Sequence, residues 1–118
     1  MILRAFIAAS VLLMTTSVQA TDCPEPPQNP PDLPDGESAG RDAMLSAQKA
    51  VKFHSTTVNA YLDCLDTNRD DIFQLLNKDQ QARWIEDYQN TVDRLRTLEE
   101  GYNIQVRAFN RRRTEAGS

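Results

Sequence analysis

Apolar side chains recur at alternating steps of three and four residues over two long stretches of the chain. This spacing places them along one face of an α-helix, as in a coiled coil. The first stripe consists of Met44, Ala47, Val51, His54, Val58, Tyr61, Leu65, Asn68, Ile72 and Leu75. The second stripe consists of Ile85, Tyr88, Val92, Leu95, Glu99, Tyr102, Val106 and Phe109.

The segment from residue 41 to residue 116 contains no proline, and Gly101 is its only glycine. Long segments without these helix breakers are typical of helices. We therefore predict helices over residues 38–76 and 79–112. Gly101 costs about 1 kcal/mol relative to alanine inside a helix. We expect a tolerated weak point there and not a helix end, because the apolar stripe continues in step beyond it.

Residues 77–81 separate the two stripes and contain no apolar side chain. We expect a turn here, with Asn77 or Asp79 capping the second helix. Folding the chain at this turn brings Leu65 opposite Val92, and apolar residues then face each other at nearly every level. The predicted fold class is therefore all-α, a long antiparallel αα-hairpin.

All six prolines lie between residues 24 and 34. Proline fixes φ and lacks an amide donor, so residues 21–37 are predicted to form an extended arm that precedes the hairpin domain, residues 38–118. One position before the main stripe, the first predicted helix carries a second stripe of mostly small residues. Small side chains form a shallow channel in which another backbone can lie close. We expect the arm to fill this channel, which is formed by Ala39, Ala43, Ser46, Ala50, Phe53, Thr57, Ala60 and Cys64.

Residues 1–20 have the pattern of a secretory signal peptide. Arg4 supplies a positive charge, an apolar run follows, and Val18-Gln19-Ala20 matches the small-residue cleavage pattern. The apolar run is too short for a membrane span of about 20 residues. We therefore predict cleavage near Ala20 and a periplasmic or secreted protein, with no transmembrane span in the mature chain.

The two cysteines, Cys23 and Cys64, are predicted to form a disulfide, because an exported protein meets an oxidising compartment. The lengths agree with this pairing. A helix from residue 38 to Cys64 rises about 40 Å, and an extended arm from Cys23 to residue 37 covers about 45 Å. The alternative is a mobile arm whose cysteine pairs with another molecule.

His54 is the only histidine, and it lies in the first heptad stripe. In the predicted register it faces Tyr102, with Glu99 one turn away, so these three residues form a polar interruption that fixes the register of the helices. A pH switch is the alternative, because imidazole changes its charge near neutral pH. One histidine and two paired cysteines do not provide the ligands of a structural zinc site.

Residues 66–71 begin like the calcium-binding loop of an EF-hand. That loop needs glycine at its sixth position and glutamate at its twelfth, where this chain has Asp71 and Asn77. We therefore favour a solvated acidic patch that binds no metal. A break in the first helix at these residues, which would leave residues 72–76 as a separate short helix, is a second reading of the same segment.

The formal net charge of -4 argues against nucleic acid as a partner, because phosphate backbones require a basic surface. Three consecutive arginines, residues 111–113, are expected to complement the dipole of the second helix, with binding to anionic lipid or envelope polymer as the alternative. Neighbouring carboxylates such as Glu99 and Glu100 do not face one another on a helix. No catalytic triad can be assembled around a single histidine inside a helix interface. We predict no enzyme and no cofactor.

Three segments resemble a loose group of small exported bacterial helical-hairpin proteins that have no assigned activity. They are the proline-rich arm that starts at Cys23, residues 61–65 (YLDCL), and residues 102–109 (YNIQVRAF). The resemblance covers most of the mature chain. It implies a location in the cell envelope and assigns no functional residue.

These patterns favour a non-enzymatic interaction or structural module of the cell envelope. The alternative is a periplasmic carrier of a small ligand or divalent metal, which would use residues 66–71 or the region of His54. The partner is expected to be an unknown envelope protein or a second copy of the chain. Self-association would use apolar residues outside the main stripes: Leu45, Leu62, Leu98 and Ile104.

Overall fold

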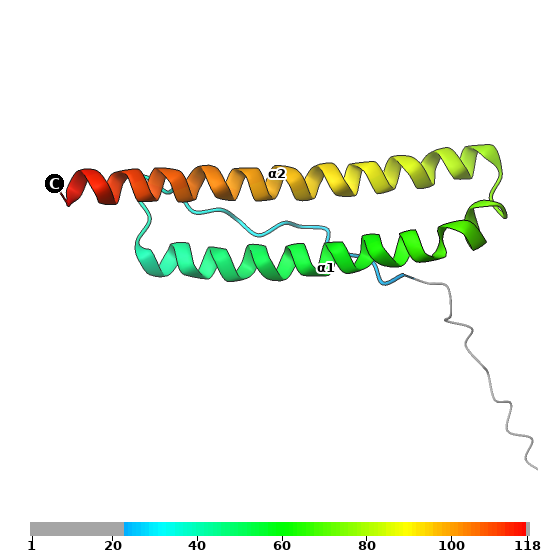
Figure 1. The fold of residues 1–118 in the computed structure, drawn as a ribbon, viewed down its shortest axis with the longest axis horizontal. Helices are drawn as coiled ribbons and strands as arrows, with labels where there is room; N and C mark the ends of the chain where they lie inside the picture. The colour runs from blue at the N-terminus through cyan, green and yellow to red at the C-terminus, as the bar shows by residue number, and fades with distance from the viewer. Residues whose placement is uncertain (1–22, 118) are drawn as a thin grey trace, which may run out of the picture.

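The computed structural model describes residues 23–117, which form two helices and no strand (Figure 1). Helix α1 spans Arg41–Phe73 and helix α2 spans Lys78–Ala116. The all-helical class is thereby confirmed. The predicted signal peptide lies outside the described residues. Neither helix in the described part of the chain has an apolar segment long enough to cross a membrane.

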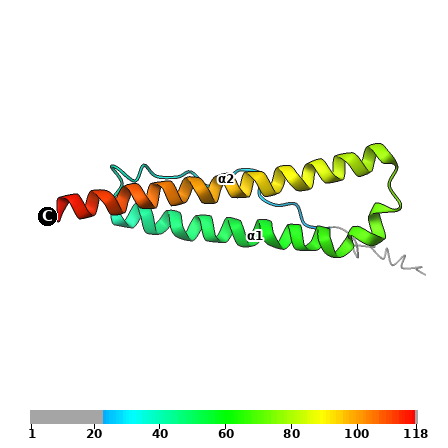
Figure 2. The ribbon, with the colours of Figure 1, turned by 45° about the horizontal axis from the view of Figure 1, so that its top comes forward.

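The two helices lie side by side and run in opposite directions, joined by a short turn (Figures 1 and 2). Their contact centres on Val58, Leu62 and Leu95, with Tyr61, Tyr88 and Val92 packed against this cluster. The apolar residues that are buried along the whole length are Met44, Ala47, Val51, Val58, Leu62, Leu95, Leu98, Ala108 and Phe109. Most of those in α1 belong to the predicted stripe, so the periodicity identified the face of α1 correctly.

The turn is stabilised by side chains that satisfy the exposed helix ends. The Asn77 side chain accepts a hydrogen bond from the Gln80 amide at 2.8 Å, and the Gln80 side chain accepts one from the Asn77 amide at 3.0 Å. This is a capping box, and it confirms Asn77 as the cap of the second helix. At the end of α1, the Phe73 carbonyl accepts the Leu76 amide, and the Gln81 side chain donates to the carbonyls of both Phe73 and Leu76.

Both ends of α1 differ from the prediction. The helix begins after Gly40 and not at residue 38, because the amides of Ser38 and Ala39 donate to the Asp35 carbonyl and form a separate turn. It ends at Phe73, so Leu75 lies outside the helix and is 80% exposed. Helix α1 is continuous through residues 66–71, so the alternative break there is wrong.

The arm and the residues that lead from it into α1, together residues 23–40, run back along one side of the hairpin, over the groove between the two helices. The extended part is the blue-to-cyan segment in Figures 1 and 2. The predicted channel on α1 is not its path. Ala43, Ser46, Ala50 and Ala60 are exposed, and Phe53 is 73% exposed. The arm instead covers apolar side chains of both helices, whereas the channel would offer it only one helix and smaller side chains.

Candidate binding groove beneath the proline arm

The inner end of the arm, residues 33–39, is fixed to α2 by close backbone contacts. Gly36 is buried, and a Cβ atom added there would overlap the Gln105 carbonyl oxygen. The Gly36 amide donates to the Gln105 side-chain oxygen at 2.8 Å. A Cβ at Gly101 would lie 3.1 Å from a methyl carbon of Leu33. Gly101, which the sequence marked as a tolerated weak point, is therefore the site where Leu33 packs on α2.

Arginines near the end of α2 also hold the inner end of the arm. Arg112 donates to the carbonyl oxygens of Glu37, at 2.7 Å, and of Ala39. Its guanidinium lies 5.3 Å from the centre of the Phe109 ring. Arg111 pairs with the Glu37 carboxylate at 3.3 Å, where both side chains are exposed. Two of the three consecutive arginines therefore bind the arm, beyond the helix-dipole role expected for all of them.

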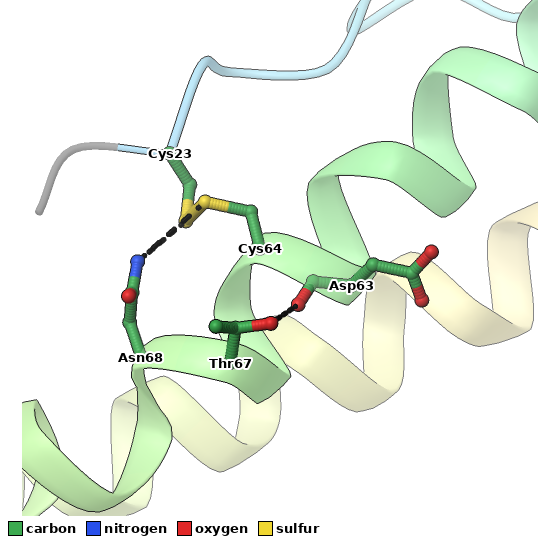
Figure 3. The surroundings of a disulfide bond; sticks show 5 residues. All are labelled: Cys23, Asp63, Cys64, Thr67 and Asn68. Atoms are coloured by element: carbon green, nitrogen blue, oxygen red, sulfur yellow. Dashed lines mark hydrogen bonds between the residues drawn. A yellow bond between two sulfur atoms is a disulfide. The ribbon is translucent and has the colours of Figure 1, made fainter.

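The outer end of the arm is attached to α1 by a disulfide between Cys23 and Cys64 (Figure 3). The two Cα atoms lie 5.7 Å apart, within the usual range for such a bond. The Asn68 amide nitrogen lies 3.6 Å from each sulfur, so the second polar residue of the α1 stripe faces the disulfide. The predicted intramolecular pairing is confirmed.

Between these two anchors, the arm and the hairpin enclose a groove of about 650 Å³. The arm supplies one wall, formed by Pro26, Pro27, Gln28, Pro30, Pro31 and Leu33. The helices supply the other, with Val58, Leu95 and Leu98 as its apolar part and His54, Asn90, Thr91, Asp93, Arg94 and Thr97 as its polar part. Small-molecule sites in proteins commonly measure about 300–1,000 Å³ and combine mostly apolar walls with a few polar groups. The groove has both properties.

The charged groups of the groove are few and lie on α2. Asp93 pairs with Arg96 at 3.8 Å, and both side chains are well exposed. Arg94 donates a long hydrogen bond of 3.5 Å to the Thr91 hydroxyl, which itself donates to the Asp87 carbonyl at 2.8 Å. An apolar molecule in contact with Val58 and Leu98 would therefore meet few charged groups.

The chain was compared with protein-family models, curated proteins and solved structures, and none of them matches it. The resemblance to exported hairpin proteins stays a prediction.

The three residues of the predicted polar interruption do not share one environment. His54 is half-buried and lines the groove, Tyr102 is half-buried on α2, and Glu99 is exposed. Among residues 23–117, no hydrogen bond joins His54 to either of the other two. A role for this set in fixing the register of the helices stays a prediction.

Sequence reasoning did not single out Thr91, and it assigned Leu98 to self-association and not to the groove. Both residues are buried on α2 at 6% exposure each. They lie on a stripe of α2 that keeps the same alternating spacing as the predicted one but faces partly toward the arm. All of its members are buried or half-buried: Trp84, Tyr88, Thr91, Leu95, Leu98, Tyr102, Gln105, Phe109 and Arg112. The stripe was not recognised because it contains polar residues, although its alternating steps of three and four residues could have indicated it.

An aromatic cluster lies at the turn end of the hairpin. The Trp84 ring packs edge-on against Phe73 at 5.9 Å and stacks on Tyr88 at 5.6 Å. The Tyr88 hydroxyl donates to the Asp66 carboxylate at 3.0 Å, and this hydrogen bond is the main reason why the pKa of Tyr88 is raised. The pKa of Tyr61 is raised as well, first by burial and then by the charges of Asp87 and Glu25.

The acidic segment 66–71 is helical and not a loop, so it cannot wrap an ion as an EF-hand loop does. Asp70 and Asp71 are exposed, and Asp66 accepts the Tyr88 hydroxyl. In the described part of the chain, no three side chains of the types that bind metals lie close enough to form a site. The segment is a solvated acidic surface of α1.

Proposed function

We propose that this protein is a non-enzymatic helical module of the cell envelope that binds a small apolar molecule between its proline arm and its hairpin. The observation that carries the proposal is the groove of about 650 Å³ whose two walls come from separate parts of the chain. Export after cleavage near Ala20 belongs to the same proposal. The disulfide supports it, because such bonds persist in oxidising compartments.

The lining supports an apolar ligand. Proline has no amide donor, so the four prolines of the arm wall offer a ligand only ring carbons and carbonyl oxygens. Opposite them lie Val58, Leu95 and Leu98, which are 4%, 8% and 6% exposed. Burial of apolar ligand surface against such walls contributes about 25 cal/mol per Å².

The hydroxyl groups near the groove support a role in binding and not in catalysis. Thr57, Thr91 and Thr97 each donate to the backbone carbonyl four residues earlier in their helix. Both thiols of the chain are joined in the disulfide. A nucleophile needs a neighbouring base that takes its proton, and none of these groups donates to His54.

The proposal is tested by titrating the oxidised protein with N-phenyl-1-naphthylamine, an uncharged apolar dye whose fluorescence rises in apolar surroundings. We expect saturable binding of one dye molecule. Thr97→Phe should abolish this binding, because Thr97 is an exposed residue of the groove wall and a larger side chain fills the space. The matched control is Asn103→Phe, which adds the same ring at an exposed position of α2 outside the groove. Equal dye binding by the two variants, or no binding by the parent protein, would contradict the proposal.

A second candidate function, docking to another protein or to a second copy, is favoured by exposed apolar side chains. Leu45, Phe53 and Ile104 are 43%, 73% and 53% exposed. Of the four residues expected to support self-association, Leu62 and Leu98 are buried within the monomer and are not available for it. Sedimentation across a wide concentration range tests self-association, and a monomer throughout would contradict it.

A further inference from the structure

The two ends of the arm are held in different ways. The inner end has a buried glycine, a hydrogen bond from Gly36 to Gln105, and two hydrogen bonds from Arg112. The outer end has the disulfide, with the Asn68 amide beside its sulfurs. Loss of the disulfide would leave the inner anchor in place.

The middle of the arm has almost no attachment of its own. Within residues 24–32, the one side-chain hydrogen bond runs from Gln28 to the Pro26 carbonyl inside the arm. No hydrogen bond or ion pair in the described structure joins these residues to either helix. Seven of the nine are exposed, and only Pro26 and Pro31 are half-buried. Neither polar contacts nor deep burial would keep this segment in place without its outer anchor.

That same segment forms the outer wall of the groove. Pro26, Pro27, Pro30 and Pro31 face Val58, Leu95 and Leu98 across the space. The position of this wall therefore depends on the bond between Cys23 and Cys64. We propose that the disulfide is a latch that closes the groove, so that the oxidised protein holds its ligand and the reduced protein releases it. This inference rests on the binding function proposed above.

The chemistry is thiol–disulfide exchange with a dithiol reductant. One thiolate of the reductant attacks a sulfur of the bond and forms a mixed disulfide, and the second thiolate then displaces the remaining cysteine. The protein gains two electrons and two protons as two thiols, and the reductant becomes a disulfide. Cys23 and Cys64 are both half-buried and not enclosed in the core, so a thiolate has access to them.

The first test compares dye binding by the oxidised protein, by the protein reduced with dithiothreitol, and by the double variant Cys23→Ser, Cys64→Ser. We expect about ten-fold weaker binding without the bond, since about 60 Å² of lost apolar contact corresponds to that factor. Circular dichroism verifies that the helices persist at the temperature used. Equal affinity with and without the bond would overturn the latch and leave the binding function intact.

A second variant covers the case in which the reduced protein unfolds. Insertion of Gly-Ser-Gly-Ser between Gln28 and Asn29 leaves the disulfide in place but lengthens the arm, so that its middle is no longer held against the helices. We expect this variant to stay helical and to bind the dye about ten-fold more weakly, for the same loss of wall contact. Parent-like affinity would overturn the latch. Asn103→Ala, which changes only an exposed side chain of α2 outside the groove, is the control and should bind like the parent.

A measurement without ligand separates failure of the latch from failure of the binding function. Methyl resonances of Val58, Leu95 and Leu98 should shift on reduction, because the prolines that face them move away. The nuclear Overhauser contact between Leu33 and Gly101 should persist, because the inner anchor remains. If the methyl resonances do not move, the latch is wrong even where no dye binds to any form.

Discussion

At the scale of single residues, Gly36 allows the arm backbone to lie directly against α2, because a Cβ atom there would overlap the Gln105 carbonyl oxygen. Gly36 lies where the arm backbone touches α2, and its φ is not in the left-handed region. The requirement for glycine there is therefore one of space and not of backbone conformation. Nothing in the local sequence indicates this, because the partner, Gln105, lies 69 positions away along the chain.

We predict that Gly36→Ala lowers the free energy of unfolding by about 1–3 kcal/mol, the usual cost of forcing an extra carbon into a filled space. Denaturant unfolding provides the measurement. Gly40→Ser is the matched control, because a Cβ at residue 40 meets no atom within 4 Å and serine is a good helix cap. If the two variants are equally stable, the arm does not lie against α2 at this point.

The raised pKa of Tyr88 predicts a loss of stability in alkali. The folded state favours the neutral phenol, which donates to Asp66. The contribution of this group is fully present below the ordinary tyrosine pKa of about 10 and is lost as the pH rises through the raised folded value. Thermal melting as a function of pH should show a steeper alkaline decline for the parent than for Tyr88→Phe. Tyr61 titrates in the same direction, so Tyr61→Phe should remove a further part of the decline.

At the scale of secondary-structure elements, periodicity predicted the helices but not all of their ends. The heptad spacing indicates which residues a helix can bury. It predicted both ends of α1 and the start of α2 to within a few residues. The ends depend on hydrogen bonds of single residues. The Asp35 carbonyl accepts two amides and forms a turn before α1, and the Gln81 side chain donates to the Phe73 and Leu76 carbonyls where α1 ends.

The capping box at the start of α2 provides a prediction for this scale. Asn77→Ala should destabilise the protein by about 1 kcal/mol, because the first amides of α2 lose a side-chain acceptor. Equilibrium unfolding measures the change. Asn103→Ala, an exposed site within α2, serves as the control and should be neutral or slightly stabilising. A neutral Asn77→Ala would mean that the turn lies elsewhere.

At the scale of the whole molecule, the arm completes a fold that two helices alone would leave narrow. The sequence predicted the arm and its disulfide from proline content, cysteine number and matching lengths. It did not predict the path of the arm, because the small-residue stripe of α1 and the groove between the helices were both long enough to hold it. The groove offers the arm apolar side chains from both helices, such as Val58 of α1 and Leu98 of α2. These residues are close together only in the folded structure, so the sequence did not show that the groove was a better path than the small-residue stripe.

The disulfide also constrains the unfolded chain. It joins residues 41 positions apart, and closing a loop of this size contributes about 4 kcal/mol on the chain-entropy model. We predict that the double variant Cys23→Ser, Cys64→Ser unfolds at lower denaturant concentration than the oxidised parent, whereas the reduced parent should match the variant. A reduced parent as stable as the oxidised one would contradict this.

The central claim is that the arm lies over the groove between the helices, attached at both ends. Nuclear Overhauser spectroscopy of the oxidised protein in solution tests it most directly. The account predicts contacts from the Leu33 methyls to Gly101 and from the arm prolines to methyls of Val58 and Leu98. Sharp arm resonances at random-coil shifts, with no contact to either helix, would contradict it.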